Sequence, residues 1–317
     1  MKYRRLGKAG IKVSEISLGA WLTFGNAVDD EITQACIEAA VEHGVNFLDI
    51  ADIYAKGEAE KAVGRAIRAL GLRRQDLVIS SKVFWPMSDN INDRGLSRKH
   101  IMESVEGSLR RIGTDYLDLY FCHRFDPETP IEEVVRAMDD LIHQGKVLYW
   151  GTSVWSAAQI EAAVGTAKVL NAYLPQVEQP RYNMFHREIE EEVMPTAAKH
   201  GIGLVVWSPL AQGILTGKYN DGIPEGSRAT YSEWIKADLT EEKLEKVRKL
   251  TALAQELGIT MAQLALAWVL RRPEISSAIT GATKVAHVLD NVKASEVVLE
   301  PEVQARIEAI LTGKDKP

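Results

Sequence analysis

Four polar side chains lie at or just after short apolar segments of this chain, and their types suit proton transfer. Asp49, Lys82 and His123 each follow such a segment, and Tyr54 lies five residues after Asp49. If these segments are neighbouring strands of a parallel barrel, the four side chains converge on the rim where such barrels hold their active sites. A carboxylate, a phenol, an ammonium and an imidazole at one point could donate and accept protons.

The phenol of Tyr54 is the candidate general acid of this set. An unperturbed phenol titrates near ~10, and we expect the ammonium of Lys82 to stabilise the phenolate and lower that pKa. Asp49 would keep Lys82 charged and in place, and a neutral His123 would orient a carbonyl oxygen through a hydrogen bond. The set could protonate an alkoxide during carbonyl reduction. None of its members donates hydride, so a redox reaction requires a cofactor.

Each of these residues also has a simpler explanation when it is considered alone. An Asp49–Lys82 pair is more often a structural ion pair, and a lone His123 is more often a satisfied core residue. The joint placement of four matched groups at three consecutive strand ends favours the catalytic explanation. Metal binding is the weaker alternative, because the seven histidines are scattered and no H-x-x-x-H motif or cysteine cluster occurs. We therefore expect no metal site.

Short apolar segments alternate with helical patterns along nearly the whole chain. This rhythm predicts parallel strands joined by crossover helices, and eight such units fit a closed (β/α)8 TIM barrel of the α/β class. The G-x-G-x-x-G motif of open dinucleotide-binding sheets is absent, and Gly213–Tyr219 has the wrong spacing for a phosphate loop. The predicted strands are Ile16–Leu18, Val45–Leu48, Leu77–Ser81, Leu117–Cys122, Val147–Gly151, Gln176–Glu178, Gly203–Val206 and Ser277–Thr280.

Three additions to a bare barrel are expected. Tyr3–Leu6 and Lys12–Ser14 read as an N-terminal β-hairpin that plugs the barrel floor. A long loop from Ser208 to about Thr240 follows the seventh strand, and loops of this length are usually functional. Extra helices are predicted near the C-terminus, over Glu241–Leu257, from Thr260 onward and over Glu302–Leu311. We interpret residues 1–317 as one domain.

Composition excludes several classes of protein. Apolar residues make up 46% of the chain, so a large core is expected, and the net charge of −6 argues against a nucleic-acid surface. The two cysteines, Cys36 and Cys122, have no paired spacing, which indicates a reducing, cytoplasmic compartment. No apolar stretch approaches the ~18 residues of a membrane span, and the N-terminus does not resemble a signal peptide.

The loops after the seventh and eighth strands are the candidate cofactor site. Barrels often bind phosphate there, at a helix N-terminus, and Thr280–Lys284 precedes a helical pattern. Lys218 and Arg228, in the long loop, could add positive charge around a pyrophosphate. Trp207 or Tyr182 could stack on a flat ring, although core packing explains either aromatic residue equally well.

These residues together resemble the aldo-keto reductase superfamily. Asp49–Tyr54 is similar to its Asp-Thr-Ala-x-x-Tyr signature, and Lys82 and His123 match the other tetrad positions. More narrowly, the chain resembles the potassium-channel β-subunit-like branch. The matching stretches are Gly19–Gly25, Arg94–His100, Tyr149–Ser153, Trp207–Ala211 and Ser227–Ala229. The resemblance implies NADP(H)-dependent reduction of aldehydes or ketones to alcohols, with Tyr54 as general acid.

The resemblance also assigns cofactor contacts residue by residue. Ser153 and Gln179 would hold the nicotinamide carboxamide, and the segment from Trp207 to Gly213 would wrap the pyrophosphate. The full set implied by the resemblance is Trp21, Asp49, Ser153, Gln179, Trp207, Ser208, Leu210, Gln212, Gly213, Lys218, Arg228, Gly281, Thr283, His287, Asp290 and Asn291.

Three positions depart from patterns within the family. His123 stands where channel subunits carry asparagine, so the chain matches the catalytic members better. Val154 replaces an arginine that contacts the cofactor in channel subunits. His287 stands where other branches place arginine or glutamine facing the 2′-phosphate, which weakens the preference for NADP, although Lys284 could compensate.

Two functions of different kinds follow. The first is a reductase of small-molecule carbonyl compounds, with Trp21, Phe84 and Trp85 lining the substrate pocket. The second is a redox-sensing regulatory subunit that binds NADP(H) and reports it to a channel or another partner. The intact tetrad favours the enzyme. The sequence leaves open the physiological substrate, the direction of reaction and the oligomeric state, which could be a homo-oligomer.

Overall fold

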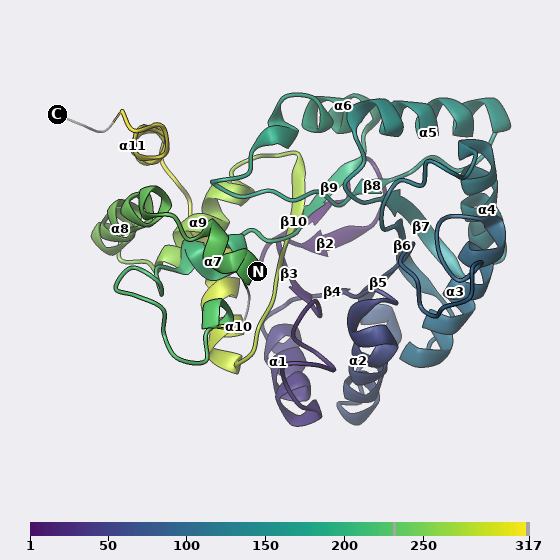
Figure 1. Ribbon diagram of the computed structural model, residues 1–317, viewed down its shortest axis with the longest axis horizontal. Helices are drawn as coiled ribbons and strands as arrows, with labels where there is room; N and C mark the ends of the chain where they lie inside the picture. Colours follow the sequence, from purple (N-terminus) through teal and green to yellow (C-terminus); the bar gives the residue numbers. More distant parts are fainter. Residues whose placement is uncertain (231–232, 315–317) are drawn as a thin grey trace.

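Eight parallel strands close into a barrel in the computed structural model, which describes residues 1–230 and 233–314 (Figure 1). This confirms the predicted (β/α)8 architecture. Going round the barrel, neighbouring strands pair in the order β10, β3, β4, β5, β6, β7, β8, β9, and β9 pairs with β10. The strands are β3 (Ile16–Gly19), β4 (Phe47–Asp49), β5 (Val78–Val83), β6 (Leu117–Cys122), β7 (Val147–Thr152), β8 (Val177–Glu178), β9 (Gly203–Val206) and β10 (Ile275–Thr280).

Helices surround the strands and supply the crossovers that a parallel sheet requires (Figure 1). Ser97 caps α3 by accepting a hydrogen bond from the His100 N–H, and Gly113 ends that helix in a left-handed conformation. The helices around the barrel are α1 (Asp30–Glu42), α2 (Glu58–Ala69), α3 (Arg98–Ile112), α4 (Ile131–His143), α5 (Ala157–Leu170), α6 (Val193–His200), α9 (Met261–Leu270) and α10 (Val285–Val292).

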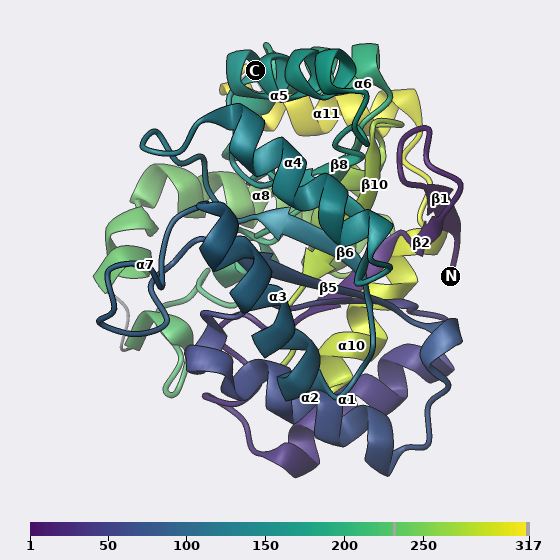
Figure 2. The same ribbon diagram turned by 90° about the vertical axis from the view of Figure 1, so that its right-hand side faces the viewer.

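An antiparallel hairpin of β1 (Tyr3–Arg5) and β2 (Lys12–Ser14) covers one end of the barrel, as predicted. Leu6 and Val13 are fully buried there, in one apolar cluster with the barrel residues Phe47 and Phe121. In Figure 2 this hairpin lies at the opposite side of the molecule from α7 (Glu233–Asp238), which belongs to the long loop. The hairpin therefore leaves the other rim free for a site.

The long loop after β9 contains two short 3-10 turns, Ala211–Thr216 and Arg228–Thr230, before α7. Residues 231–232 of this predicted loop, and residues 315–317 of the predicted domain, lie outside the described part of the chain. The additional helices α8 (Glu241–Glu256) and α11 (Pro301–Thr312) lie side by side. Each of their ends lies within one residue of the predicted end.

No single helix in the described ranges is long and apolar enough to cross a membrane. Helices α8 and α9 pass that test only when they are combined across a bend of 93°. Every residue of α9 is buried, so its apolar character serves the core of this barrel.

Candidate active site

The ammonium of Lys82 joins two other members of the predicted tetrad, Asp49 and Tyr54. Its Nζ lies 2.8 Å from Asp49 Oδ2, 2.7 Å from the Ile50 carbonyl oxygen and 3.2 Å from the Tyr54 hydroxyl. The side chain of Lys82 is completely buried, so these three oxygens take the place of water around the charge. A buried ammonium hydrogen-bonded to a phenol is the proton-transfer arrangement that the sequence predicts.

The strand register explains this convergence. Asp49 is the last residue of β4 and pairs with Ser80 of β5, two residues before Lys82. Residues two apart on a strand face the same side, so Ser80 and Lys82 both reach Asp49. The second carboxylate oxygen of Asp49 accepts hydrogen bonds from Ser80 Oγ at 2.7 Å and from Gln179 Nε2 at 2.9 Å. Both oxygens are therefore fixed by neighbouring side chains.

The pKa of Tyr54 differs from the sequence prediction. Burial raises the pKa of this phenol above its usual value, and the nearby charge of Lys82 offsets only part of that effect. The predicted lowering is therefore wrong, because the same pocket that brings Lys82 close also removes water from the phenolate. For Lys82 itself, burial favours the neutral amine, but the charges and hydrogen bonds of Asp49 and Tyr54 together outweigh burial, and the pKa of Lys82 is raised. The pair holds a protonated phenol beside a charged ammonium.

His123 follows β6 and its ring lies near the phenol. The ring centroids of His123 and Tyr54 are 5.9 Å apart, in an edge-to-face arrangement. Burial, together with the charges of Lys82 and Arg124, holds the pKa of His123 well below its usual range. The imidazole is therefore neutral, which is the condition for the role considered for it in the sequence, and it carries one N–H that can donate a hydrogen bond.

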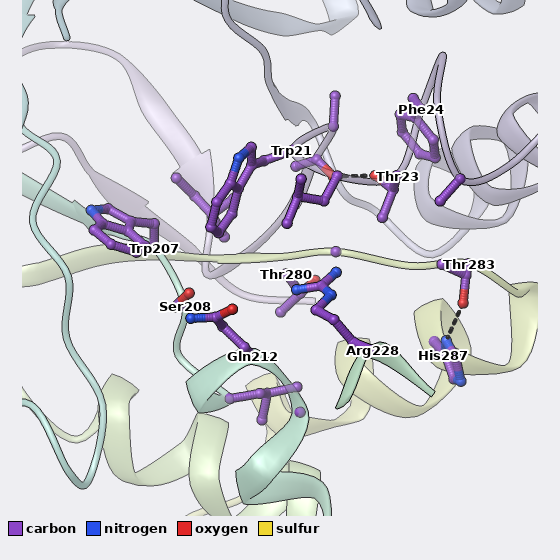
Figure 3. A pocket seen from close by; sticks show the side chains of 18 of the residues that line it. Trp21, Thr23, Phe24, Trp207, Ser208, Gln212, Arg228, Thr280, Thr283 and His287 are labelled. Carbon is purple, nitrogen blue, oxygen red and sulfur yellow. Dashed lines mark hydrogen bonds between the residues drawn. The ribbon is translucent and has the colours of Figure 1, made fainter. Parts of the chain in front are cut away.

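A cavity of about 1020 Å³ extends from the tetrad across the rim. Figure 3 shows Trp21 and Trp207 toward one end of it, Thr283 and His287 at the other, and Arg228 between them. Every residue that the resemblance assigns to the cofactor lines this cavity: Trp21, Asp49, Ser153, Gln179, Trp207, Ser208, Leu210, Gln212, Gly213, Lys218, Arg228, Gly281, Thr283, His287, Asp290 and Asn291. Its elongated form suits an extended ligand.

Two predicted aromatic contacts lie elsewhere. Phe84 does not line the cavity, whereas Trp85 does, and the Phe84 ring packs edge-to-face behind Trp85 at 5.1 Å. Both residues lie just after β5, which ends at Val83, and only the Trp85 ring reaches the cavity. Tyr182 is completely buried and stacks on Trp268 at 5.4 Å. Of the two candidates for ring stacking, only Trp207 faces the cavity.

The far end of the cavity gathers positive charge. Lys218, Arg228 and Lys284 line it together with His287, whose ring lies 3.5 Å from the Thr283 hydroxyl. Burial, together with the charges of Lys218 and Lys284, lowers the pKa of His287. The charges of Lys218 and Lys284 therefore reach this imidazole, and positive charge of this kind attracts a phosphate.

The loop after β9 lines the cavity in an unusual conformation. Ser208, Ala211 and Gln212 have φ angles of 52°, 46° and 58°, in the left-handed region that costs L-residues about 1–2 kcal/mol each. The Lys218 side chain lies so close to Gly213 that a β-carbon there would sit 2.9 Å from Nζ. Gln212 Oε1 is buried without a hydrogen-bond partner in the described residues. A strained loop with an unsatisfied polar atom fits a ligand that completes its contacts.

A buried polar network behind the tetrad was not foreseen from the sequence. Ser104 of α3 donates to Asp52 Oδ2 at 2.9 Å, and Ser81, next to Lys82, donates to Glu60 Oε1 at 2.7 Å. Arg111 donates to the other oxygen of Glu60 at 2.5 Å. The signal was present, because Asp52 lies between Asp49 and Tyr54. These bonds tie the segment that carries Tyr54 to α3, and they tie β5, which carries Lys82, to α2 and α3.

Asp52→Asn is expected to change how stability depends on pH. Burial and the charge of Glu60 raise the pKa of Asp52 to about 7, whereas an unfolded carboxyl titrates near ~3.9. The folded protein thus holds a proton that the unfolded chain releases, and stability falls as pH rises from ~4 through 7. The Asp52→Asn variant does not lose stability in this way. The difference between its free energy of unfolding and that of the wild type should therefore shift in favour of the variant as pH rises. Urea unfolding at pH 5 and pH 8 measures this difference, and parallel curves would contradict it.

The closed barrel and its rim tetrad agree with the sequence comparison. A model of the aldo/keto reductase family matches residues 15–312, and the chain belongs to this family.

Several relatives are similar over the full length. The chain is 50% identical to a probable voltage-gated potassium channel subunit beta of Arabidopsis thaliana, over 100% of this chain and 98% of the relative. It is 48% identical to the protein of the same name in Oryza sativa subsp. japonica, with the same coverage. It is also 46% identical to a putative subunit of this kind from Schizosaccharomyces pombe, over 98% and 93% of the two chains.

Proposed function

We propose that this chain is an NADP(H)-dependent reductase that converts aldehydes or ketones to alcohols. The observation that carries the proposal is the position of Lys82 Nζ, which bonds to both Asp49 and Tyr54 at the base of the long cavity. Tyr54 donates a proton to the carbonyl oxygen, and the Lys82 ammonium stabilises the resulting phenolate. The neutral imidazole of His123 donates a hydrogen bond that orients that oxygen.

The cofactor would supply the hydride that no side chain provides. Ser153 and Gln179 are suited to the carboxamide end, since both are buried beside Asp49 and Gln179 already donates to its carboxylate. Lys218, Arg228 and Lys284 are suited to the phosphates at the cationic end of the cavity. Lys218 and Arg228 would face the pyrophosphate that NAD and NADP share. Lys284 supports NADP over NAD, because its charge reaches His287, where the 2′-phosphate would add negative charge.

Stopped-flow mixing of NADPH-loaded protein with 4-nitrobenzaldehyde tests the reaction. We expect loss of bound NADPH absorbance in a single turnover, with a slower phase when the transferred hydrogen is deuterium. Absence of oxidation with this and other reactive aldehydes would overturn the enzyme proposal. Comparing NADPH with NADH affinities by fluorescence titration, with His287→Arg as a control expected to favour NADPH further, tests the cofactor.

A second function is supported by the names of the relatives. They are described as channel subunits, and a protein of that kind could bind NADP(H) and report its redox state to a partner. The two functions share the cofactor cavity and differ in turnover: a sensor would bind NADPH tightly without oxidising it in the presence of aldehydes. The tetrad with His123 supports the enzyme. The two cysteines are free and buried, which supports a reducing, cytoplasmic compartment.

A further inference from the structure

A guanidinium that was not singled out in the sequence lines the substrate end of the cavity. Arg124 directly follows His123, and its Nη1 donates to the backbone oxygen of His123. Its Cζ lies 5.7 Å from the ring centroid of Trp85, which lines the same cavity. These two contacts hold the side chain between the backbone of His123 and the indole of Trp85, on the tetrad side of the cavity.

This position separates Arg124 from the cationic end assigned to the phosphates. Arg124 follows β6, next to the tetrad, whereas Lys218 and Arg228 come from the loop after β9, and Lys284 follows β10. Two distinct cationic sites therefore face one cavity, with the phenol of Tyr54 beside the first. The cofactor phosphates account for only the second.

Arg124 lacks a charge partner in the described part of the chain. No carboxylate there forms an ion pair with it, although it is partly buried, and burial lowers its pKa. Glu178 is the carboxyl whose charge acts on the pKa of Arg124. Its oxygens, however, accept hydrogen bonds from other groups, namely Thr152 Oγ1 and the Trp155 N–H. Burial raises the pKa of Glu178 to about 7, so it is only partly ionised at neutral pH. An arginine carries its charge throughout this range.

We propose that Arg124 binds a carboxylate of the substrate, and that the enzyme prefers carbonyl compounds that carry one. The proposal rests on the proposed reductase function and names its substrate class. A guanidinium presents parallel N–H donors that match the two oxygens of a carboxylate. One donor is used by the His123 carbonyl, and the others remain available toward the cavity. Trp21 and Trp85 supply apolar surface for the part of the substrate between its carbonyl and its carboxylate.

A purely structural role for Arg124 makes a different prediction. If the side chain only braces His123 and Trp85, its removal should slow all carbonyl substrates by the same factor. If it binds a carboxylate, its removal should raise the KM of anionic substrates and leave neutral ones little changed. A comparison across substrate charge therefore separates the two roles.

The test measures kcat/KM for NADPH oxidation with 2-, 3- and 4-carboxybenzaldehyde and with their methyl esters. The wild type is compared with Arg124→Met and Arg124→Lys. Dividing the effect of each substitution on the acid by its effect on the ester cancels intrinsic differences in carbonyl reactivity. For at least one isomer we expect Arg124→Met to reduce this ratio by about ten- to a hundredfold, and Arg124→Lys by less. In the wild type, added KCl should raise KM for that acid only.

Equal losses for acid and ester in all three isomers would overturn the carboxylate proposal while leaving the reductase function intact. A binding measurement tests the same proposal without requiring turnover. Calorimetric titration with terephthalate, and with its dimethyl ester as control, should show binding of the dianion to NADP⁺-loaded wild type and its loss in Arg124→Met. Equal affinity in the two proteins would overturn the proposal, even if no aldehyde is reduced. Thermal unfolding of each variant verifies that it is folded.

Discussion

Tyr54→Phe is expected to lower kcat for aldehyde reduction by about 10²–10⁴-fold, the range that a positioned general acid contributes. The substitution removes one oxygen, the atom 3.2 Å from Lys82 Nζ, and leaves the ring that faces His123. Binding of NADPH should change little, because the phenol is not among the groups assigned to the cofactor. Single-turnover stopped flow with saturating NADPH measures the chemical step directly.

The matched control for this prediction is a carbonyl compound of higher intrinsic reactivity, such as 9,10-phenanthrenequinone. Its reduction depends less on proton donation, so the variant should lose less activity with it than with 4-nitrobenzaldehyde. A loss below about tenfold with both substrates would show that another group is the acid. His123 would then be the alternative donor, since it lines the cavity and its neutral imidazole carries an N–H.

Lys82→Met is expected to abolish measurable reduction and also to destabilise the fold by about 3–5 kcal/mol, the cost of leaving a buried charge without its partner. Lys82 is fully buried and Asp49 is 3% exposed, so the carboxylate left behind has little access to water. Methionine fills a similar volume without a charge. Urea unfolding measures the stability, and NADPH oxidation measures the activity.

A double variant separates the two effects of Lys82→Met. Asp49→Asn removes the carboxylate charge, so Lys82→Met combined with Asp49→Asn should be more stable than Lys82→Met alone. Activity should remain absent in the double variant, because the ammonium that acts on Tyr54 is still missing. If the double variant is less stable than the single one, the loss arises from packing rather than from an unpaired charge.

The fold and the place of the site were predictable because both follow from local periodicity. A crossover helix between two consecutive strands makes those strands run parallel, and parallel strands bring their carboxyl ends to one rim. Asp49, Lys82 and His123 could therefore be grouped although 74 positions separate the first from the last. Parallel strand register then determines which side chains share a side. That is why the tetrad needed no information beyond strand boundaries.

Properties that depend on how deeply a side chain is buried, or on the direction in which it points, were not predictable in the same way. The pKa of Tyr54 was predicted with the wrong direction, because the pattern shows a nearby ammonium but not the loss of solvent. Phe84 and Trp85 are equally aromatic in sequence, and only the direction of the segment after β5 decides which one lines the cavity. Glu60 of α2 bonds to Ser81 of β5 and to Arg111 of α3, contacts between distant segments that no local spacing predicts.

The closure of the barrel has a consequence for how the chain folds. The strand that completes the ring, β10, pairs with β3, and Arg4 of the hairpin donates to the Leu270 carbonyl oxygen, 266 positions away. Until β10 is synthesised, β3 and β9 remain open edges that can pair with other chains. Such distant contacts make folding slow and leave intermediates prone to aggregation. During synthesis on a ribosome, the rim that carries Tyr54 and Lys82 therefore cannot close into a ring until β10 has been made.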